Sequence, residues 1–150
     1  MNAKAIPQLD IFAKLVSQWE QASNKLEALA EAIPAPKFDF RPTEEVRSVA
    51  EVLRHVAFWN LYVADTLRGR KTQDNANELP QEKYASKQQI LSALKHSARQ
   101  VTEGLRDSSS DFSEQPTELV LTFIAHNCEH YGQLAIYARL NRVVPPASRG

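Results

Sequence analysis

The chain has 150 residues, 43% of them hydrophobic and 24% charged, which is the composition of ordinary soluble domains and not of disordered or fibrous proteins. Its eighteen basic side chains balance eighteen acidic ones. Without excess positive charge the chain is not suited to collect a nucleic-acid backbone or an anionic bilayer, so we expect neither partner. The length predicts one domain, residues 1–150, with a single core.

The first residues, which include Pro7 and Asp10, contain no apolar stretch of signal-peptide length. No uncharged run approaches the length of a membrane span. We therefore expect a cytoplasmic protein. Cys128 is the only cysteine, which excludes an internal disulfide and a cysteine-rich zinc site. A metal site in this chain would have to use His, Asp and Glu.

Apolar residues spaced by three, four and seven predict a long first helix. They are Leu9, Phe12, Val16, Trp19, Leu26, Leu29 and Ile33. Pro34 and Pro36 end this helix, because proline lacks a backbone donor and restricts the residue before it. A polar connection then runs to Arg47.

Ser48 and Glu51 have the spacing of a capping box and predict the start of a second helix. Its apolar face is formed by Val49, Val52, Leu53, Val56, Trp59 and Val63. The helix is expected to end near Gly69, since glycine suits a helix end. Residues 69–85 show no period and predict a loop.

Ser86 and Gln89 repeat the capping pattern before a third helix. The apolar residues of this helix are Ile90, Leu94, Val101 and Leu105. We expect a serine-rich turn over residues 107–115.

Pro116 or Thr117 opens the last helix, because proline is tolerated in a first turn. This helix continues through Leu119, Val120, Phe123, Ile124, Leu134, Ile136, Tyr137 and Leu140. Pro145 and Pro146 end any further helix. With no segment suited to a strand, the sequence predicts an all-α protein, a four-helix bundle.

The connections restrict the topology. The roughly 17 residues between helices two and three can extend about 55 Å, whereas a 20-residue helix is only about 30 Å long, so a crossover is allowed there. The shorter link between helices three and four predicts that these two are antiparallel neighbours.

Three of the four histidines, His55, His126 and His130, lie in predicted helix interiors at positions that can point inward. His126 and His130 are four apart, which places their Cβ atoms about 5 to 6 Å from one another on one face, and Gln133 lies one turn further. By itself such a pair is more often a surface or core feature than a metal site. His55, in the second helix, could lie opposite the pair in a bundle. His96, between basic residues, is expected to be solvated and is left out.

The segment SVAEVLRHVAFWN, residues 48–60, resembles the second helix of the DinB (YfiT-like) family. The segment IAHNCEHYGQL, residues 124–134, and the residues that follow it resemble the fourth helix and tail of that family. The resemblance implies a metal-binding histidine triad at His55, His126 and His130. It also implies an up-down-down-up bundle with a crossover between helices two and three, and frequently a homodimer. Characterised relatives include thiol-dependent transferases and isomerases.

A site of three neutral imidazoles leaves one coordination position open, as in catalytic zinc sites. Water or a thiol in that position loses a proton more readily and becomes a nucleophile near neutral pH. Affinity order favours copper, nickel or zinc, and we expect one divalent ion, zinc or nickel. Metal occupancy should fall in mild acid, because the imidazoles become protonated.

Several neighbouring residues are secondary candidates for the pocket. Trp59 either walls the pocket or is a structural tryptophan. Asn60 and Gln133 either orient ligands or substrate, or are capped or solvated amides. Tyr131 and Tyr137 are expected to be packing residues.

Residues 126–130 also fit the H-x-x-E-H pattern of inverted zinc proteases, in which the glutamate is the general base. Those proteases take a further ligand from well downstream, and no acidic residue follows His130 in this sequence. We therefore reject a protease and keep Glu129 as a candidate base or hydrogen-bond acceptor. A ferritin-like di-iron centre is also excluded, since no Glu-x-x-His motif occurs.

The sequence thus predicts a metal-dependent enzyme, a transferase or a hydrolase, that activates water or a low-molecular-weight thiol toward a small-molecule substrate. The alternative is a stress-associated protein that binds metal without turnover. A third hypothesis makes the three histidines an internal hydrogen-bonded cluster.

Overall fold

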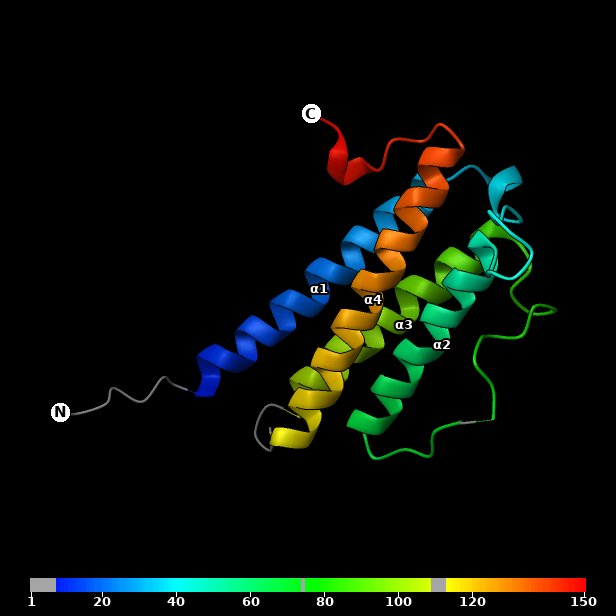
Figure 1. The fold of residues 1–150 in the computed structure, drawn as a ribbon. Helices are drawn as coiled ribbons and strands as arrows, with labels where there is room; N and C mark the ends of the chain where they lie inside the picture. Colours follow the sequence, from blue (N-terminus) through cyan, green and yellow to red (C-terminus); the bar gives the residue numbers. More distant parts are fainter. Residues whose placement is uncertain (1–7, 74, 109–112) are drawn as a thin grey trace.

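The computed structural model describes residues 8–73, 75–108 and 113–150, with side chains from residue 11 onward. It contains four long helices: α1 (Gln8–Ala32), α2 (Val49–Leu67), α3 (Lys87–Asp107) and α4 (Glu114–Leu140). Two short 3-10 helices, η1 (Ala35–Lys37) and η2 (Pro146–Ser148), follow α1 and α4 (Figure 1). No strand occurs in these three ranges, and the predicted all-α class is confirmed.

Both predicted capping boxes are present. The hydroxyl of Ser48 accepts a hydrogen bond from the backbone N–H of Glu51, and the Glu51 carboxylate accepts one from the backbone N–H of Ser48 at 2.7 Å. Ser86 and Gln89 make the same reciprocal pair at the start of α3. These bonds satisfy amide groups that a first helical turn leaves unpaired, so the sequence sets both starting points.

The first helix follows its predicted apolar stripe. Of that stripe, Trp19, Leu26, Leu29 and Ile33 are fully buried, while the side chain of Leu9 lies outside the described residues. The indole N–H of Trp19 donates to the backbone carbonyl of Ala98 in α3 at 3.1 Å. The helix ends just before Pro34, as predicted.

The last helix begins at Glu114, slightly earlier than predicted, with Pro116 in its first turn. Residues 109–112 of the predicted turn lie outside the described residues, and Asp107 is the last residue of α3. Of the apolar residues that predict α4, Ile136 and Leu140 do not face the core, since they are 57% and 59% exposed. The helix therefore carries a second apolar face.

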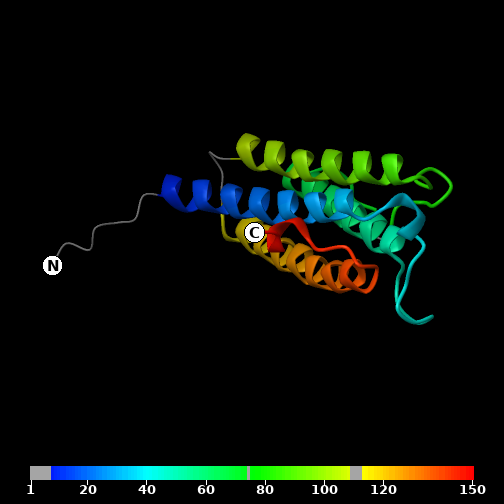
Figure 2. The ribbon, with the colours of Figure 1, turned by 90° about the horizontal axis from the view of Figure 1, so that it is seen from above.

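The helices run up, down, down and up, with the segment between α2 and α3 crossing the length of the bundle (Figure 1). This confirms the predicted topology. Each of α1 and α2 packs against both α3 and α4. Viewed from above, α3 and α4 lie on opposite sides of the bundle, with α1 and α2 between them (Figure 2).

The expectation that helices three and four are antiparallel is confirmed, but the expectation that they are neighbours is wrong. They occupy diagonal positions. The connection between them has six residues and can extend about 20 Å, which is enough to cross the end of a bundle from corner to corner. Link length restricts the choice of neighbours but does not decide it.

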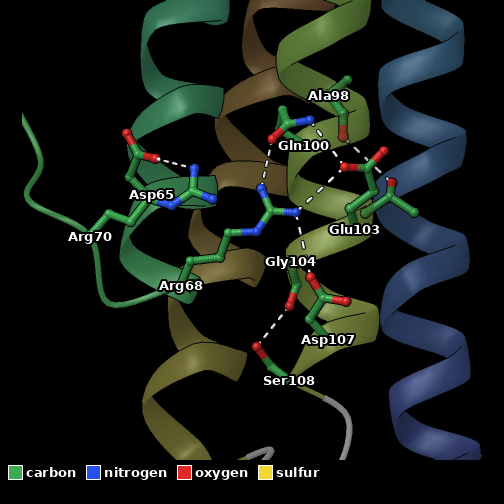
Figure 3. Close-up of polar contacts among 10 residues, drawn as sticks. Asp65, Arg68, Arg70, Ala98, Gln100, Glu103, Gly104, Asp107 and Ser108 are labelled. Carbon is green, nitrogen blue, oxygen red and sulfur yellow. Dashed lines mark hydrogen bonds and ion pairs between the residues drawn. The ribbon is translucent and has the colours of Figure 1, made fainter.

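The end of α2 is tied to α3 by Arg68 (Figure 3). Its guanidinium donates to the side-chain carbonyl of Gln100 at 2.7 Å and lies 3.5 Å from the carboxylates of Glu103 and Asp107. The next residue, Gly69, has a φ of +64°, a left-handed conformation that glycine adopts without a steric penalty. The chain leaves α2 here and begins the crossover.

A buried polar layer separates the two apolar clusters of the bundle. Each helix contributes one buried side chain to it: Ser23, Asn60, Ser97 and Asn127. Asn60 donates to the hydroxyl of Ser97 and accepts from the amide of Asn127, both at 3.3 Å. Asn127, the member of this layer that α4 contributes, directly follows His126. The layer therefore lies at the same height along α4 as His126.

None of the helices, over the residues described, combines the length and apolar character that crossing a membrane requires.

Candidate metal centre

The three predicted histidines come together between α2 and α4. The Nε2 atom of His126 lies 3.0 Å from Nε2 of His55 and 3.2 Å from Nε2 of His130. His126 and His130 lie one turn apart on the same face of α4. His55 lies opposite them on α2, which packs beside α4. One ring nitrogen from each residue lies within 4.8 Å of the other two, so a single ion could contact all three.

The ring of His55 is held by the crossover. Its Nδ1 lies 2.6 Å from the backbone carbonyl of Asn77. A carbonyl only accepts hydrogen bonds, so Nδ1 carries the proton in this contact and Nε2 presents its lone pair to His126. A loop residue thus fixes which nitrogen of His55 is free to bind an ion.

The ring of His130 is held by a hydrogen-bonded chain. Its Nδ1 lies 2.9 Å from the side-chain oxygen of Gln133, whose amide nitrogen donates to the hydroxyl of Tyr137 at 2.9 Å. That hydroxyl donates in turn to the backbone carbonyl of Arg47. The chain orients the Gln133 amide with its oxygen toward His130, so Nδ1 of His130 carries the proton and its Nε2 is free.

These donor and acceptor positions fit a metal ion. The lone pairs of His55 and His130 both point toward Nε2 of His126, and one proton on His126 could not donate fully to both. A divalent cation satisfies three converging imidazole lone pairs at once. Nδ1 of His126 is buried without a hydrogen-bond partner, as is the side-chain oxygen of the adjacent Asn127.

His55 and His126 are held in the neutral form that binds metal. The pKa of His55 is lowered to about 4, mainly by burial; the hydrogen bond with Asn77 acts in the raising direction, and the nearby charges of Arg47 and His130 act in the lowering direction. Burial, followed by the charges of His130 and His55, also lowers the pKa of His126 to about 4. At neutral pH no proton therefore competes with a cation for these two rings.

His55 and His126 of the cluster line a cleft of about 650 Å³ between α2, α4 and the crossover. The residues that line it are His55, Trp59, Asn77, Thr122, Phe123, Ala125, His126 and Glu129. Trp59 stacks on Phe123 with ring centroids 5.7 Å apart, and its indole N–H donates to the Asn77 side chain at 2.8 Å. The cleft thus has an aromatic wall beside the ring nitrogens.

The remaining predicted residues differ in whether they line the cleft, pack in the core or lie away from the histidines. Glu129 is exposed and lines the cleft. Asn60 is not a solvated amide and does not line the cleft; it is 1% exposed, in the buried polar layer. Tyr131 packs against the core, as predicted, whereas Tyr137 adds a hydrogen-bonding role to its packing. His96 is exposed on α3, away from the cluster.

The sequence prediction missed four of the residues that line the cleft: Asn77, Thr122, Phe123 and Ala125. Asn77 lies in the non-periodic crossover and contacts His55 through a backbone atom, so residue type gives no signal for it. Phe123 was assigned only to the apolar face of α4. Thr122 has no motif that marks it.

A family model described as the DinB superfamily matches residues 18–134 of the chain. The chain belongs to the DinB superfamily. The matched segment contains His55, His126 and His130 and reaches from α1 into the second half of α4. No curated protein matches the chain. The histidine cluster, which lies within the matched segment, is therefore the candidate functional site of this DinB-superfamily protein.

Proposed function

We propose that this DinB-superfamily protein binds one divalent metal ion through the Nε2 atoms of His55, His126 and His130, and that it catalyses a thiol-transfer or hydrolytic reaction on a small molecule. The observation that carries the proposal is the convergence of three Nε2 atoms beside an open cleft that His55 and His126 line. Zinc or nickel is the ion that we expect. When bound, such an ion lowers the pKa of a water or thiol that occupies its open position.

The residues of the cleft have separate tasks in this proposal. The backbone carbonyl of Asn77 and the amide of Gln133 hold two imidazoles with their lone pairs toward the ion. The stacked rings of Trp59 and Phe123 offer an apolar wall for part of the substrate. The Glu129 carboxylate, exposed at the same cleft, accepts the proton that the nucleophile releases.

The second candidate is a protein that binds metal without turnover, in a structural or sensory role. It is favoured by the small number of acidic and basic side chains that line the cleft. Apart from His55 and His126, Glu129 is the one acid or base among the residues that line it. In this second candidate the metal would stabilise the contact between α2 and α4 and do no chemistry.

Kinetics with metal-loaded and EDTA-treated protein separate the candidates. The enzyme proposal expects zinc- or nickel-loaded protein to consume a low-molecular-weight thiol with a small electrophile, or to hydrolyse an activated ester, and Glu129→Gln to lower kcat. A large metal-dependent rise in Tm without any turnover would favour the binding protein. A Tm that does not respond to metal would favour the internal hydrogen-bonded cluster.

The proposed setting is the cytoplasm. A thiol cosubstrate and the exposed, unpaired Cys128 both suit a reducing compartment. Comparing the thiol state of Cys128 in fractions of the producing cell checks this part of the proposal.

A further inference from the structure

A second cavity lies on another pair of helices. It is a groove of about 540 Å³ between α1 and α3, which pack side by side (Figure 2). All the residues that line it belong to these two helices, and none of them lines the metal cleft. Ser23 and Ala98, which are buried and line the groove, have side chains too small to fill the space between the helices. The volume lies within the range of small-molecule sites, about 300 to 1,000 Å³.

Ion pairs between α1 and α3 lie at both ends of this groove. At one end the guanidinium of Arg106 lies 3.2 Å from the carboxylate of Glu20. At the other end the ammonium group of Lys95 is paired with the carboxylate of Glu31. These pairs neutralise the charges at the two ends, so a ligand would have to be recognised by the residues between them.

Two opposite charges between these ends have no partner. Glu103 also lines the groove, but its carboxylate is paired with Arg68 of the α2 terminus. Glu27 on α1 and Arg99 on α3 form no hydrogen bond or ion pair with any residue that the structure describes. Burial raises the pKa of Glu27, while the charges of Lys95 and Arg99 act in the lowering direction. The groove thus presents one unpaired carboxylate and, near it, one unpaired guanidinium.

A buried hydroxyl in the same groove is also without a partner. Ser23 lies one turn before Glu27 on the same face of α1. It is 5% exposed, and its hydroxyl makes no hydrogen bond to the described residues. The hydroxyl of Thr102, which also lines the groove, donates instead to the backbone carbonyl of Ala98. Rotation about the Cα–Cβ bond of Ser23 turns its hydroxyl toward the groove, where a ligand would satisfy it.

We propose that this groove binds a free α-amino acid, with the carboxylate of the ligand on Arg99, its ammonium group on Glu27 and a further hydrogen bond to the Ser23 hydroxyl. A guanidinium binds a carboxylate through two parallel N–H···O bonds. A purely anionic ligand would be repelled by the unpaired Glu27, and a purely cationic ligand would be repelled by the unpaired Arg99. An α-amino acid carries both charges on one carbon atom, so one small molecule satisfies both groups.

Calorimetry with each standard amino acid in turn tests the site. The full chain is first treated with EDTA, so that an amino acid cannot bind through an ion in the metal cleft. At least one amino acid should bind saturably and raise the Tm, because a ligand that binds only the folded chain stabilises it. Its N-acetyl derivative lacks the ammonium group and its amide derivative lacks the carboxylate, so each should bind at least about tenfold more weakly.

Variants locate the binding in this groove. Glu27→Gln and Arg99→Gln should each weaken it at least about tenfold. Glu44→Gln and Arg142→Gln remove the same charges from exposed positions outside the groove and should leave the affinity unchanged. Ser23→Ala should weaken binding and at the same time raise the Tm of the ligand-free chain, because it removes a buried hydroxyl without a partner.

Three results would overturn the proposal. The first is the absence of saturable binding by any amino acid. The second is equal binding of the amino acid and its two singly charged derivatives, which would show that the two charges are not recognised together. The third is native affinity in the Glu27→Gln and Arg99→Gln variants, which would place the ligand elsewhere on the chain.

Discussion

The Nε2 atoms of His55 and His126 lie 3.0 Å apart, although 71 positions separate the two residues in the chain. The contact exists because α2 and α4 pack side by side, with the crossover supplying the carbonyl that orients His55. The site is therefore a product of the tertiary fold, while His126 and His130 by themselves provide only two ligands on one helix.

Gln133→Leu should weaken metal binding without unfolding the protein. The substitution removes the acceptor of His130 Nδ1 and the donor to Tyr137. Loss of such an orienting partner typically costs tenfold to about 100-fold in metal affinity. Zinc titration by calorimetry measures the effect, with Gln18→Leu on the exposed face of α1 as the control. Equal affinities in the two variants would show that Gln133 does not orient the ligand.

Asn127→Leu should destabilise the fold through the buried polar layer. It removes the donor to the side-chain oxygen of Asn60, which is then buried without a partner. An orphaned buried acceptor costs about 1 to 3 kcal/mol, to be measured as a lower free energy of unfolding in urea. Asn141→Leu removes an amide that bonds only to the backbone carbonyl of Tyr137 at the end of α4, and it should cost less. An Asn127 variant as stable as the native chain would contradict this account of the layer.

The sequence predicted what depends on local patterns. Ser48 and Ser86 mark two helix starts because a capping box is completed within four residues. The histidines were found because His126 and His130 have helical spacing and because the segments around them and around His55 resemble a known family.

What the sequence did not predict depends on contacts between distant segments. The backbone carbonyl of Asn77 orients His55 from a loop without period, and a backbone atom leaves no trace in residue type. The diagonal placement of α3 and α4 follows from packing of all four helices, which a link length cannot supply. Ile136 looks like a core residue by type, yet it lies on the second apolar face of α4.

Acid should destabilise the metal-free protein in a defined window. The pKa values of His55 and His126 lie at about 4, below their ordinary value of 6.5. Between these values the unfolded chain binds more protons than the folded one, so the free energy of unfolding decreases as pH falls from 6.5 to about 4. Above pH 6.5 these two residues contribute no slope.

Urea denaturation of EDTA-treated protein across that pH range measures this dependence. The double variant His55→Gln, His126→Gln is the control, because it keeps every other titrating group. Its unfolding free energy should vary less with pH than that of the native chain. Parallel curves for the two proteins would show that these histidines are not held neutral by burial.

Ser48→Ala should lower the free energy of unfolding by about 1 kcal/mol, because the N–H of Glu51 loses its acceptor at the start of α2. Ser86→Ala should have a similar effect through Gln89 at the start of α3. Ser92→Ala, at an exposed position inside α3, should change stability little or slightly increase it. Thermal and urea unfolding would give the three free energies of unfolding. A Ser48→Ala variant as stable as the Ser92→Ala variant would show that the Ser48 cap does not stabilise the fold.

The metal content of the purified chain tests the central claim most directly. After loading with zinc or nickel and removal of free ion, elemental analysis should find one ion per native chain and per His96→Ala chain. Each of His55→Ala, His126→Ala and His130→Ala should retain far less than one. Native protein without bound metal, or three histidine variants that keep the native content, would contradict the account.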